Sequence, residues 1–207
     1  MSSSRTRSRA APSRGAPALL CLALAAAGTA AAQAPAGSTA PLTDEGPAPL
    51  VAPNVAALSA VNLALRTGDK AKALELADDG MKRFPQDAQL RFAHAVILGD
   101  LGRVDEETAE FETMCSQFPE LPEPYNNLAT IRAAQGRYAD AEHLLQQALA
   151  AAPNYGTARE NLGDLYIAMA IASYEKAGKI DPANAFVQKK LAIARELSEK
   201  LRAARKR

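Results

Sequence analysis

The sequence predicts an all-α solenoid of stacked helix pairs that ends in a C-terminal capping helix. Two kinds of residue mark a 34-residue period along the chain. The first mark is a glycine, at Gly68, Gly102 and Gly136. The second is a proline 17 residues after each glycine, at Pro85, Pro119 and Pro153. Two independent marks on one period of this length are typical of repeated helix pairs.

The glycines and prolines predict different boundaries. A glycine just after a helix can adopt the left-handed conformation that ends it, so each glycine predicts the turn inside a pair. A proline cannot continue a helix but is tolerated in a first turn, so each proline closes one pair and opens the next. The runs between these marks suit helices of about 12–14 residues.

The period divides the chain into repeats 54–87, 88–121 and 122–155, and the third is the most regular. It reads PEPYNNLATIRAAQGRYADAEHLLQQALAAAPNY. Small residues at Ala129, Ala141 and Ala148 allow its two helices to approach closely, while large residues fill the gaps between them.

This pattern resembles the tetratricopeptide repeat family. The resemblance is carried by a large aromatic residue, a Leu–small pair, the turn glycine and the closing proline, which are Tyr125, Leu128, Ala129, Gly136 and Pro153. It implies a right-handed solenoid of tetratricopeptide helix pairs over residues 54–205. Repeat two departs from the pattern at Glu107, where a small residue is usual, so we expect its pair to pack less tightly.

The fourth repeat, 156–181, is atypical. It has no glycine at the turn position, and Pro182 follows Pro153 by 29 residues. A five-residue deletion leaves either one long bent helix, running to about Gly178, or two helices. We expect Asp181 to cap a final helix, 182–205, with Pro182 at its first position. An apolar stripe on that helix would cover the end of the stack; its residues are Phe186, Val187, Leu191, Ala194, Leu197 and Leu201.

The N-terminal segment predicts export from the cytoplasm. Four arginines without an acid precede a short apolar run with small residues at Ala30 and Ala32, as in a secretory signal peptide. We expect cleavage after Ala32, a disordered Ala/Pro-rich linker over 33–53, and a periplasmic protein. The alternative is an uncleaved segment that anchors the protein in the inner membrane.

Charge is distributed unevenly along the chain. The formal charge is +1, and removal of the four arginines of the leader makes the remainder acidic. Residues 189–207 are nevertheless strongly basic, with Glu196 and Glu199 as their only acids. An acidic body excludes a nucleic-acid partner. The basic end is either a solvated helix terminus or a contact for an anionic membrane surface or an acidic partner.

The sequence offers no catalytic or metal-binding motif. His94 and His143 lie in no zinc-binding pattern, and no nucleotide-binding glycine loop or nucleophile elbow is present. We expect His94 to be partly buried beside a partner, His143 to be solvated and Cys115 to act as a small buried hydrophobe. The prediction is a protein without enzymatic activity, cofactor or small-molecule substrate.

In the tetratricopeptide family, partners dock on the concave face, which is lined by the first helix of each pair. The resemblance places these residues there: Asn62, Phe92, Val96, Asn126, Asn127, Thr130, Glu160, Asn161 and Asp164. Asn126, Asn127 and Asn161 could pair with the backbone of an extended peptide, or Asn127 and Asn161 could instead hold adjacent helices together. The face carries acids but no Lys or Arg, so a basic or amphipathic peptide fits better than a C-terminal carboxylate.

These expectations describe a protein–protein interaction scaffold in the periplasm that assists cell-envelope assembly or secretion. The alternative is a membrane-anchored subunit of an envelope complex.

Overall fold

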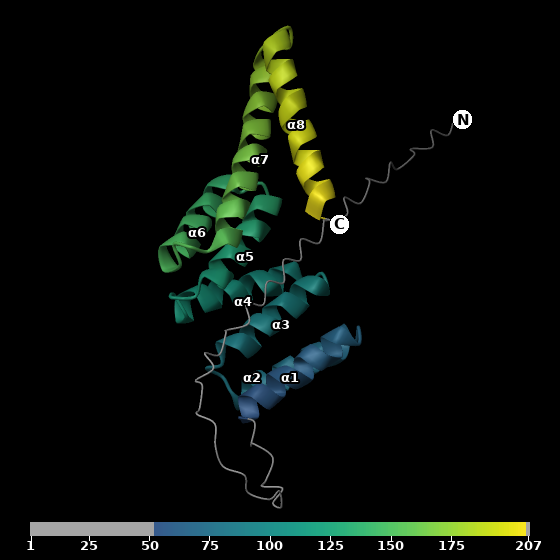
Figure 1. Cartoon of the computed structure of the whole chain (residues 1–207), viewed down its shortest axis with the longest axis vertical. Coiled ribbons are helices and arrows are strands. Elements are labelled where there is room, and N and C mark those ends of the chain that lie inside the picture. The colour runs from purple at the N-terminus through teal and green to yellow at the C-terminus, as the bar shows by residue number, and fades with distance from the viewer. Residues whose placement is uncertain (1–51, 206–207) are drawn as a thin grey trace, which may run out of the picture.

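The computed structural model describes residues 52–205, and these residues form eight helices and no strand (Figure 1). The helices are α1 (Pro53–Arg66), α2 (Lys70–Arg83), α3 (Ala88–Asp100), α4 (Val104–Gln117), α5 (Pro122–Ala134), α6 (Tyr138–Ala151), α7 (Gly156–Ile180) and α8 (Ala185–Arg205). Within the described part of the chain, no helix combines the length and apolar character needed to cross a bilayer. The predicted signal peptide, 1–32, and most of the predicted linker lie outside the described residues.

The glycine turns form as predicted. Gly68, Gly102 and Gly136 have φ of 82°, 76° and 77°, and they are the glycines with positive φ among the described residues. At Gly102 the backbone N–H donates to the Gly99 carbonyl at 2.9 Å, and the N–H of Arg103 donates to the Leu98 carbonyl at 2.9 Å. This bonding satisfies the last carbonyls of α3, and equivalent bonds end α1 and α5.

The prolines lie between helix pairs, in turns, rather than at helix starts. Pro85, Pro119 and Pro153 each sit two residues after one helix and three residues before the next. Pro182 has the same place between α7 and α8, so the expectation that it opens the last helix was wrong.

The final helix is also capped by a different residue from the one expected. The side-chain oxygen of Asn184 accepts the N–H of Val187 at 3.1 Å, as an N-cap does. Asp181 instead follows the last residue of α7, where its N–H donates to the Ala177 carbonyl. The spacing from Pro182 to the start of α8 equals the spacing from each earlier inter-pair proline to the helix that follows it. By this spacing, α8 corresponds to the first helix of a further pair.

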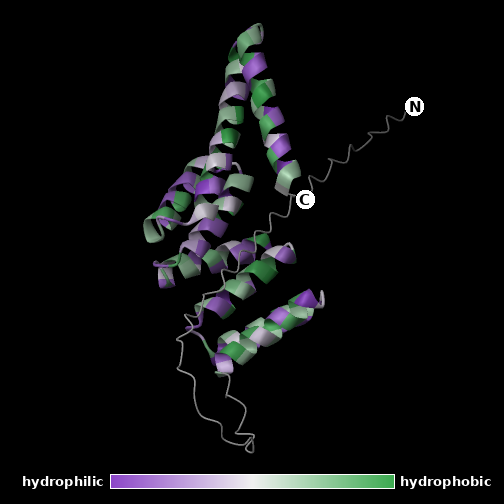
Figure 2. Ribbon diagram, viewed as in Figure 1, coloured by the Kyte–Doolittle hydropathy of each residue, from purple (hydrophilic) through white to green (hydrophobic). Residues whose placement is uncertain are grey.

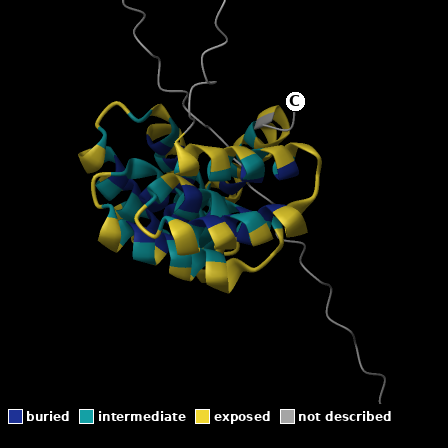
Figure 3. Cartoon of the chain, turned by 90° about the horizontal axis from the view of Figure 1, so that it is seen from below, coloured by how far each residue is buried: buried dark blue, intermediate teal, exposed yellow. Residues whose placement is uncertain are grey.

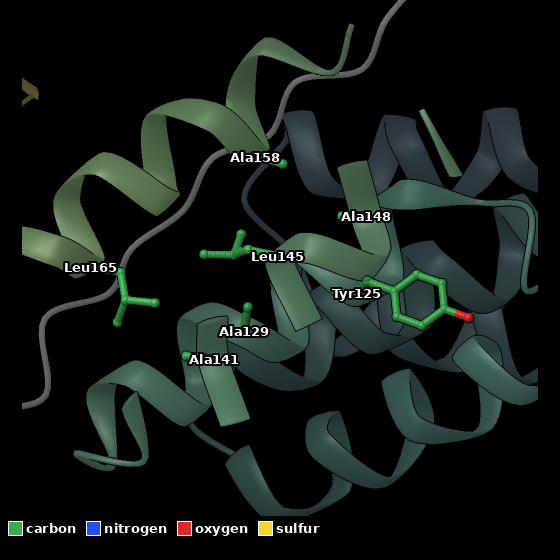
Figure 4. Close-up of a cluster of buried hydrophobic side chains, with 7 residues drawn as sticks. All are labelled: Tyr125, Ala129, Ala141, Leu145, Ala148, Ala158 and Leu165. Atoms are coloured by element: carbon green, nitrogen blue, oxygen red, sulfur yellow. The ribbon is translucent and has the colours of Figure 1, made fainter. Parts of the chain in front are cut away.

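The core consists of buried clusters along the stack, and neighbouring clusters share a helix. Each of three buried clusters joins one helix pair to the first helix of the next. Figure 4 shows the cluster formed by Tyr125 and Ala129 of α5, three residues of α6, and Ala158 and Leu165 of α7. Since one pair cannot bury its own apolar face, this overlap is the expected source of stability, and the predicted all-α solenoid is confirmed. Figure 3 shows the buried residues between the helices and the exposed ones on the outward surfaces and turns.

In repeat two, the side chain of Glu107 fits between the helices because the residue facing it on α3 is a glycine. A Cβ placed on Gly99 of α3 would lie 2.4 Å from Oε1 of Glu107, so the carboxyl group occupies the space that a side chain at position 99 would need. The close approach is thus made at Gly99 rather than at the usual small residue. The helices α3 and α4 share fewer neighbouring residues than those of the other two regular pairs, which agrees with the expectation from the sequence.

Repeat four is one continuous helix. Its first half carries Ala158, Asn161 and Leu165, which are buried against α5 and α6, and its second half projects beyond the stack (Figure 1). There α8 runs back alongside α7, and α7 is the one helix with which it makes extensive contact. The last helix therefore packs on the projecting half of α7, instead of covering the end of the stack broadly as expected.

Candidate functional site

The candidate site lies on the first helices of the pairs, which are α1, α3, α5 and the first half of α7. The 34-residue period brings the predicted residues to equivalent positions on successive helices. One such row consists of Asn62, Val96, Thr130 and Asp164. The members of the row differ in exposure and bonding, so each helix offers different chemistry to a partner.

The two asparagines that best fitted a peptide-binding role are buried and bonded to each other. Asn126 of α5 is 3 % exposed and Asn161 of α7 is 9 % exposed. The Nδ2 of Asn161 donates to the Oδ1 of Asn126 at 2.8 Å. A buried amide must find a partner, and here it finds one in the neighbouring repeat. The pair therefore joins α5 to α7, which is one of the two roles that the sequence left open for Asn161.

Two other polar side chains of the predicted set on α5 bond to their own helix. The Nδ2 of Asn127 donates to the Glu123 carbonyl at 2.9 Å, and the hydroxyl of Thr130 donates to the Asn127 carbonyl at 2.7 Å. Both side chains are partly exposed. Asn127 thus does not hold adjacent helices together through this bond.

The apolar residues of the candidate site are partly buried against the core. Phe92 packs its ring on Phe111, with centroids 5.7 Å apart, and Val96 contacts the same buried cluster. Both residues keep some exposed surface, and Asn62 on α1 is likewise partly buried. These residues offer apolar edges to a partner rather than whole side chains.

Two acids of the predicted set lie at the α7 end of the face, and Glu160 is the exposed member of that set. Glu160 is exposed and Asp164 is partly exposed, and they lie one turn apart on one face of α7. Glu123 of α5 adds a third, partly exposed carboxylate at the partner-facing position of the neighbouring repeat. The site therefore has negative charge at one end.

A further acidic pair, Asp100 and Glu107, lies beside α3 and α4; the sequence placed Asp100, but not Glu107, on the partner-facing side. Glu107 is partly buried, and burial, followed by the charge of Asp100, raises the pKa of its carboxyl group to about 7. Asp100 is bridged by Lys70, whose Nζ lies 3.4 Å from Oδ2 of Asp100. The signal in the sequence was the departure of Glu107 from the repeat pattern.

Cys115, His94 and His143 are the residues that were considered from the sequence as candidates for chemistry. Burial raises the pKa of Cys115 to about 11, so its thiol is not activated. The Nε2 of His94 lies 3.2 Å from Oδ1 of Asp78, and His143 is exposed, so both expectations are confirmed. Among residues 52–205, no group of three or more His, Cys, Asp or Glu side chains is placed to hold a metal ion.

Family models confirm the resemblance that the repeats suggested. Two models described as tetratricopeptide repeat match residues 58–122 and 120–196. The chain belongs to the tetratricopeptide repeat family. Members of this family are built to hold other proteins, and this tetratricopeptide protein is a protein–protein interaction scaffold in that general sense.

Several solved structures share this tetratricopeptide fold. The first domain of Spaghetti (RPAP3), bound to the HSP90 peptide SRMEEVD, is similar with a TM-score of 0.52 and 17 % identity, over 56 % of this chain and 93 % of that chain. The MamA protein gives 0.51 and 20 %, over 73 % and 85 %. A tetratricopeptide repeat protein from Parabacteroides merdae gives 0.51 and 17 %, over 71 % and 60 %. No curated protein matches the chain.

Proposed function

We propose that this tetratricopeptide protein is a non-enzymatic scaffold of the bacterial periplasm that holds a basic or amphipathic segment of a partner protein on its concave face. Its role would be in cell-envelope assembly or secretion. We infer the chemistry of the partner from three carboxylates on α5 and α7, which are Glu123, Glu160 and Asp164.

Charge decides the kind of peptide. No Lys or Arg occupies the equivalent partner-facing positions of α1, α3, α5 and α7. A peptide that brings Lys or Arg to Glu160 and Asp164 gains complementary charge, and one that brings carboxylates is repelled. Toward α3, the exposed edges of Phe92 and Val96 suit apolar side chains of the same peptide.

Burial of the asparagine pair changes which residues should contact the partner. Asn126 and Asn161 already use their amides in the contact between α5 and α7. We therefore expect Glu160 and Asp164 to contribute more to partner binding than the asparagines do.

The RPAP3 structure supplies a useful contrast. Its bound peptide, SRMEEVD, is acidic, and this chain lacks basic residues where a tetratricopeptide domain could meet such carboxylates. An acidic peptide of this kind is therefore a suitable negative control.

The test uses a fluorescent peptide with lysines and leucines at helical spacing, and SRMEEVD as the control. Fluorescence anisotropy should show binding of the basic peptide alone, weakening as salt is raised. Asp164→Lys should weaken it about tenfold, on the scale of a charge pair at a partly exposed site. Glu75→Lys, the same charge change at an exposed site on α2, should have little effect. Equal binding of both peptides, or equal loss in both variants, would refute the proposed face.

The compartment has its own test. Mass spectrometry of the protein recovered from its host should give a mature N-terminus at Gln33 in the soluble periplasmic fraction. A chain that retains its first residues and sediments with membranes would instead support the anchored subunit.

A further inference from the structure

One side of α8 carries exposed apolar residues. Phe186, Ile193 and Leu197, here called the α8 stripe, are 67 %, 67 % and 44 % exposed. They lie beside the stripe that packs on α7, which includes the buried Leu191. Figure 2 shows hydrophobic residues interleaved with hydrophilic ones along this helix. An exposed apolar stripe of this kind is suited to a partner.

The α8 stripe adjoins a groove. A groove of about 280 Å³ lies between α7 and α8, and its lining includes Ile167, Ala170 and Tyr174 of α7 with Lys190, Ile193 and Leu197 of α8. Two residues of the stripe thus form one wall of the groove. Paired ridges with a groove between them accept the side chains of another helix.

We propose that the α8 stripe is a dimer interface, on which α8 of a second copy of this chain packs antiparallel. The occupant follows from charge along the helix. Lys189 and Glu196 are seven residues, or about two turns, apart, so they lie on the same edge of the stripe. Within one chain, Oε1 of Glu196 already lies 2.7 Å from Nζ of Lys200. In an antiparallel pair centred on Ile193, this edge faces its own counterpart, and Glu196 of each copy lies between its own Lys200 and Lys189 of the other.

The arrangement is self-complementary. Ile193 meets its own counterpart at the centre, and two symmetric ion pairs border it on one edge. A two-fold interface requires a patch of this kind, on which each residue finds its complement in the same surface. The hairpin of α7 and α8 projects from the stack (Figure 1).

The dimer is independent of the proposed partner-binding function, since it uses none of the same residues. If both hold, each dimer presents two concave faces, and a partner with two binding segments gains affinity through effective concentration.

Sedimentation velocity of the purified chain over a range of concentrations tests the proposal. The parent should be dimeric. Ile193→Asp should weaken self-association at least about a hundredfold, since it buries an acid at the centre of the interface. Circular dichroism of the variant should match the parent, because Ile193 is exposed in the monomer.

Charge-reversal variants distinguish this antiparallel dimer from nonspecific hydrophobic association. Lys189→Glu and Glu196→Lys should each weaken the dimer about tenfold, and the double variant should restore it, because the symmetric pairs are then reversed but still complementary. Glu199→Lys makes the same charge change on the opposite side of α8 and should leave the dimer unchanged.

A parent that is monomeric at every concentration would overturn the proposal, as would a dimer insensitive to Ile193→Asp or one that the double variant fails to restore. Phosphatidylglycerol vesicles supply the remaining comparison. Binding of a monomeric chain to them that is lost in Ile193→Asp would assign the α8 stripe to a membrane surface instead.

Discussion

Glu107 offers the clearest test of how one departure from the repeat pattern affects the fold. Its carboxyl group occupies the space beside Gly99, and its pKa is raised from 4.5 to about 7. The folded state therefore binds the proton more tightly than the unfolded state does. By linkage, stability from this group is fully present below pH 4.5, is lost as pH rises toward 7, and is constant above that.

Replacing Glu107 by Gln removes the charge and keeps the size. A difference of about 2.5 pK units corresponds to at most about 3.4 kcal/mol. Solvent screens a partly exposed carboxylate, so we expect the variant to exceed the parent by about 1–2 kcal/mol in unfolding free energy at pH 8. Below pH 4.5 the two should be nearly equal, because both side chains are then neutral.

The assay is urea unfolding followed by circular dichroism, at constant ionic strength between pH 4 and 8.5. All other carboxylates are common to both proteins, so the difference isolates Glu107 together with its interaction with Asp100. Glu75→Gln, at an exposed acid that pairs with Lys72, serves as the control and should show no gain at high pH. A Glu107→Gln variant no more stable than the parent at pH 8, or a difference that does not change with pH, would refute the reasoning.

A substitution at Gly99 tests the raised pKa of Glu107 in a second way. A methyl group at this position takes the space of the Glu107 carboxyl group, which can swing toward solvent because it ends a flexible side chain. Gly99→Ala should therefore lower the pKa of Glu107 toward its ordinary value and flatten the pH dependence of stability. In a Glu107→Gln background the same substitution should leave the pH dependence unaltered.

Three further predictions concern the turns and the buried amides. Gly102→Ala should lower the unfolding free energy by about 1 kcal/mol in urea titrations, because φ of 76° strains any residue with a Cβ. Asn126→Ala should cost about 1–3 kcal/mol, since it removes the acceptor of the buried Asn161 amide; a cycle with Asn161→Ala should then show coupling, and strict additivity would contradict the hydrogen bond. Asn184→Ala should cost about 1 kcal/mol and raise amide hydrogen exchange in the first turn of α8, and unchanged exchange there would argue against this cap.

Much of the fold was predictable because its rules are local. A glycine in the left-handed region and a proline after a helix depend on a few neighbouring residues, and both recur on one period. The start of α8 was missed although the same rule held: each helix that follows an inter-pair proline begins three residues later, and Ala185 follows Pro182 by that interval. Asp181 was expected to cap α8 because sequence alone does not show where α7 ends.

The candidate site was less predictable. The period identified which residues share a row, but it could not show which of them face a neighbouring repeat. Asn126 is buried because α7 packs beside α5 and its Asn161 reaches across, a contact between residues 35 positions apart. Glu107 was recognised as unusual, yet its raised pKa depends on Gly99 and Asp100, which belong to the facing helix and its end.

The sequence by itself therefore determined that this is a solenoid of helix pairs whose repeats carry a net negative charge, since periodicity and charge are properties of the chain. The tertiary structure alone decided which amides are buried in the stack and which acids remain accessible, because burial depends on how successive helices cover one another. It also decided that α8 packs only on the projecting half of α7. Loss of the turn in repeat four carries that half past the stack, and no neighbour remains to cover Phe186, Ile193 and Leu197.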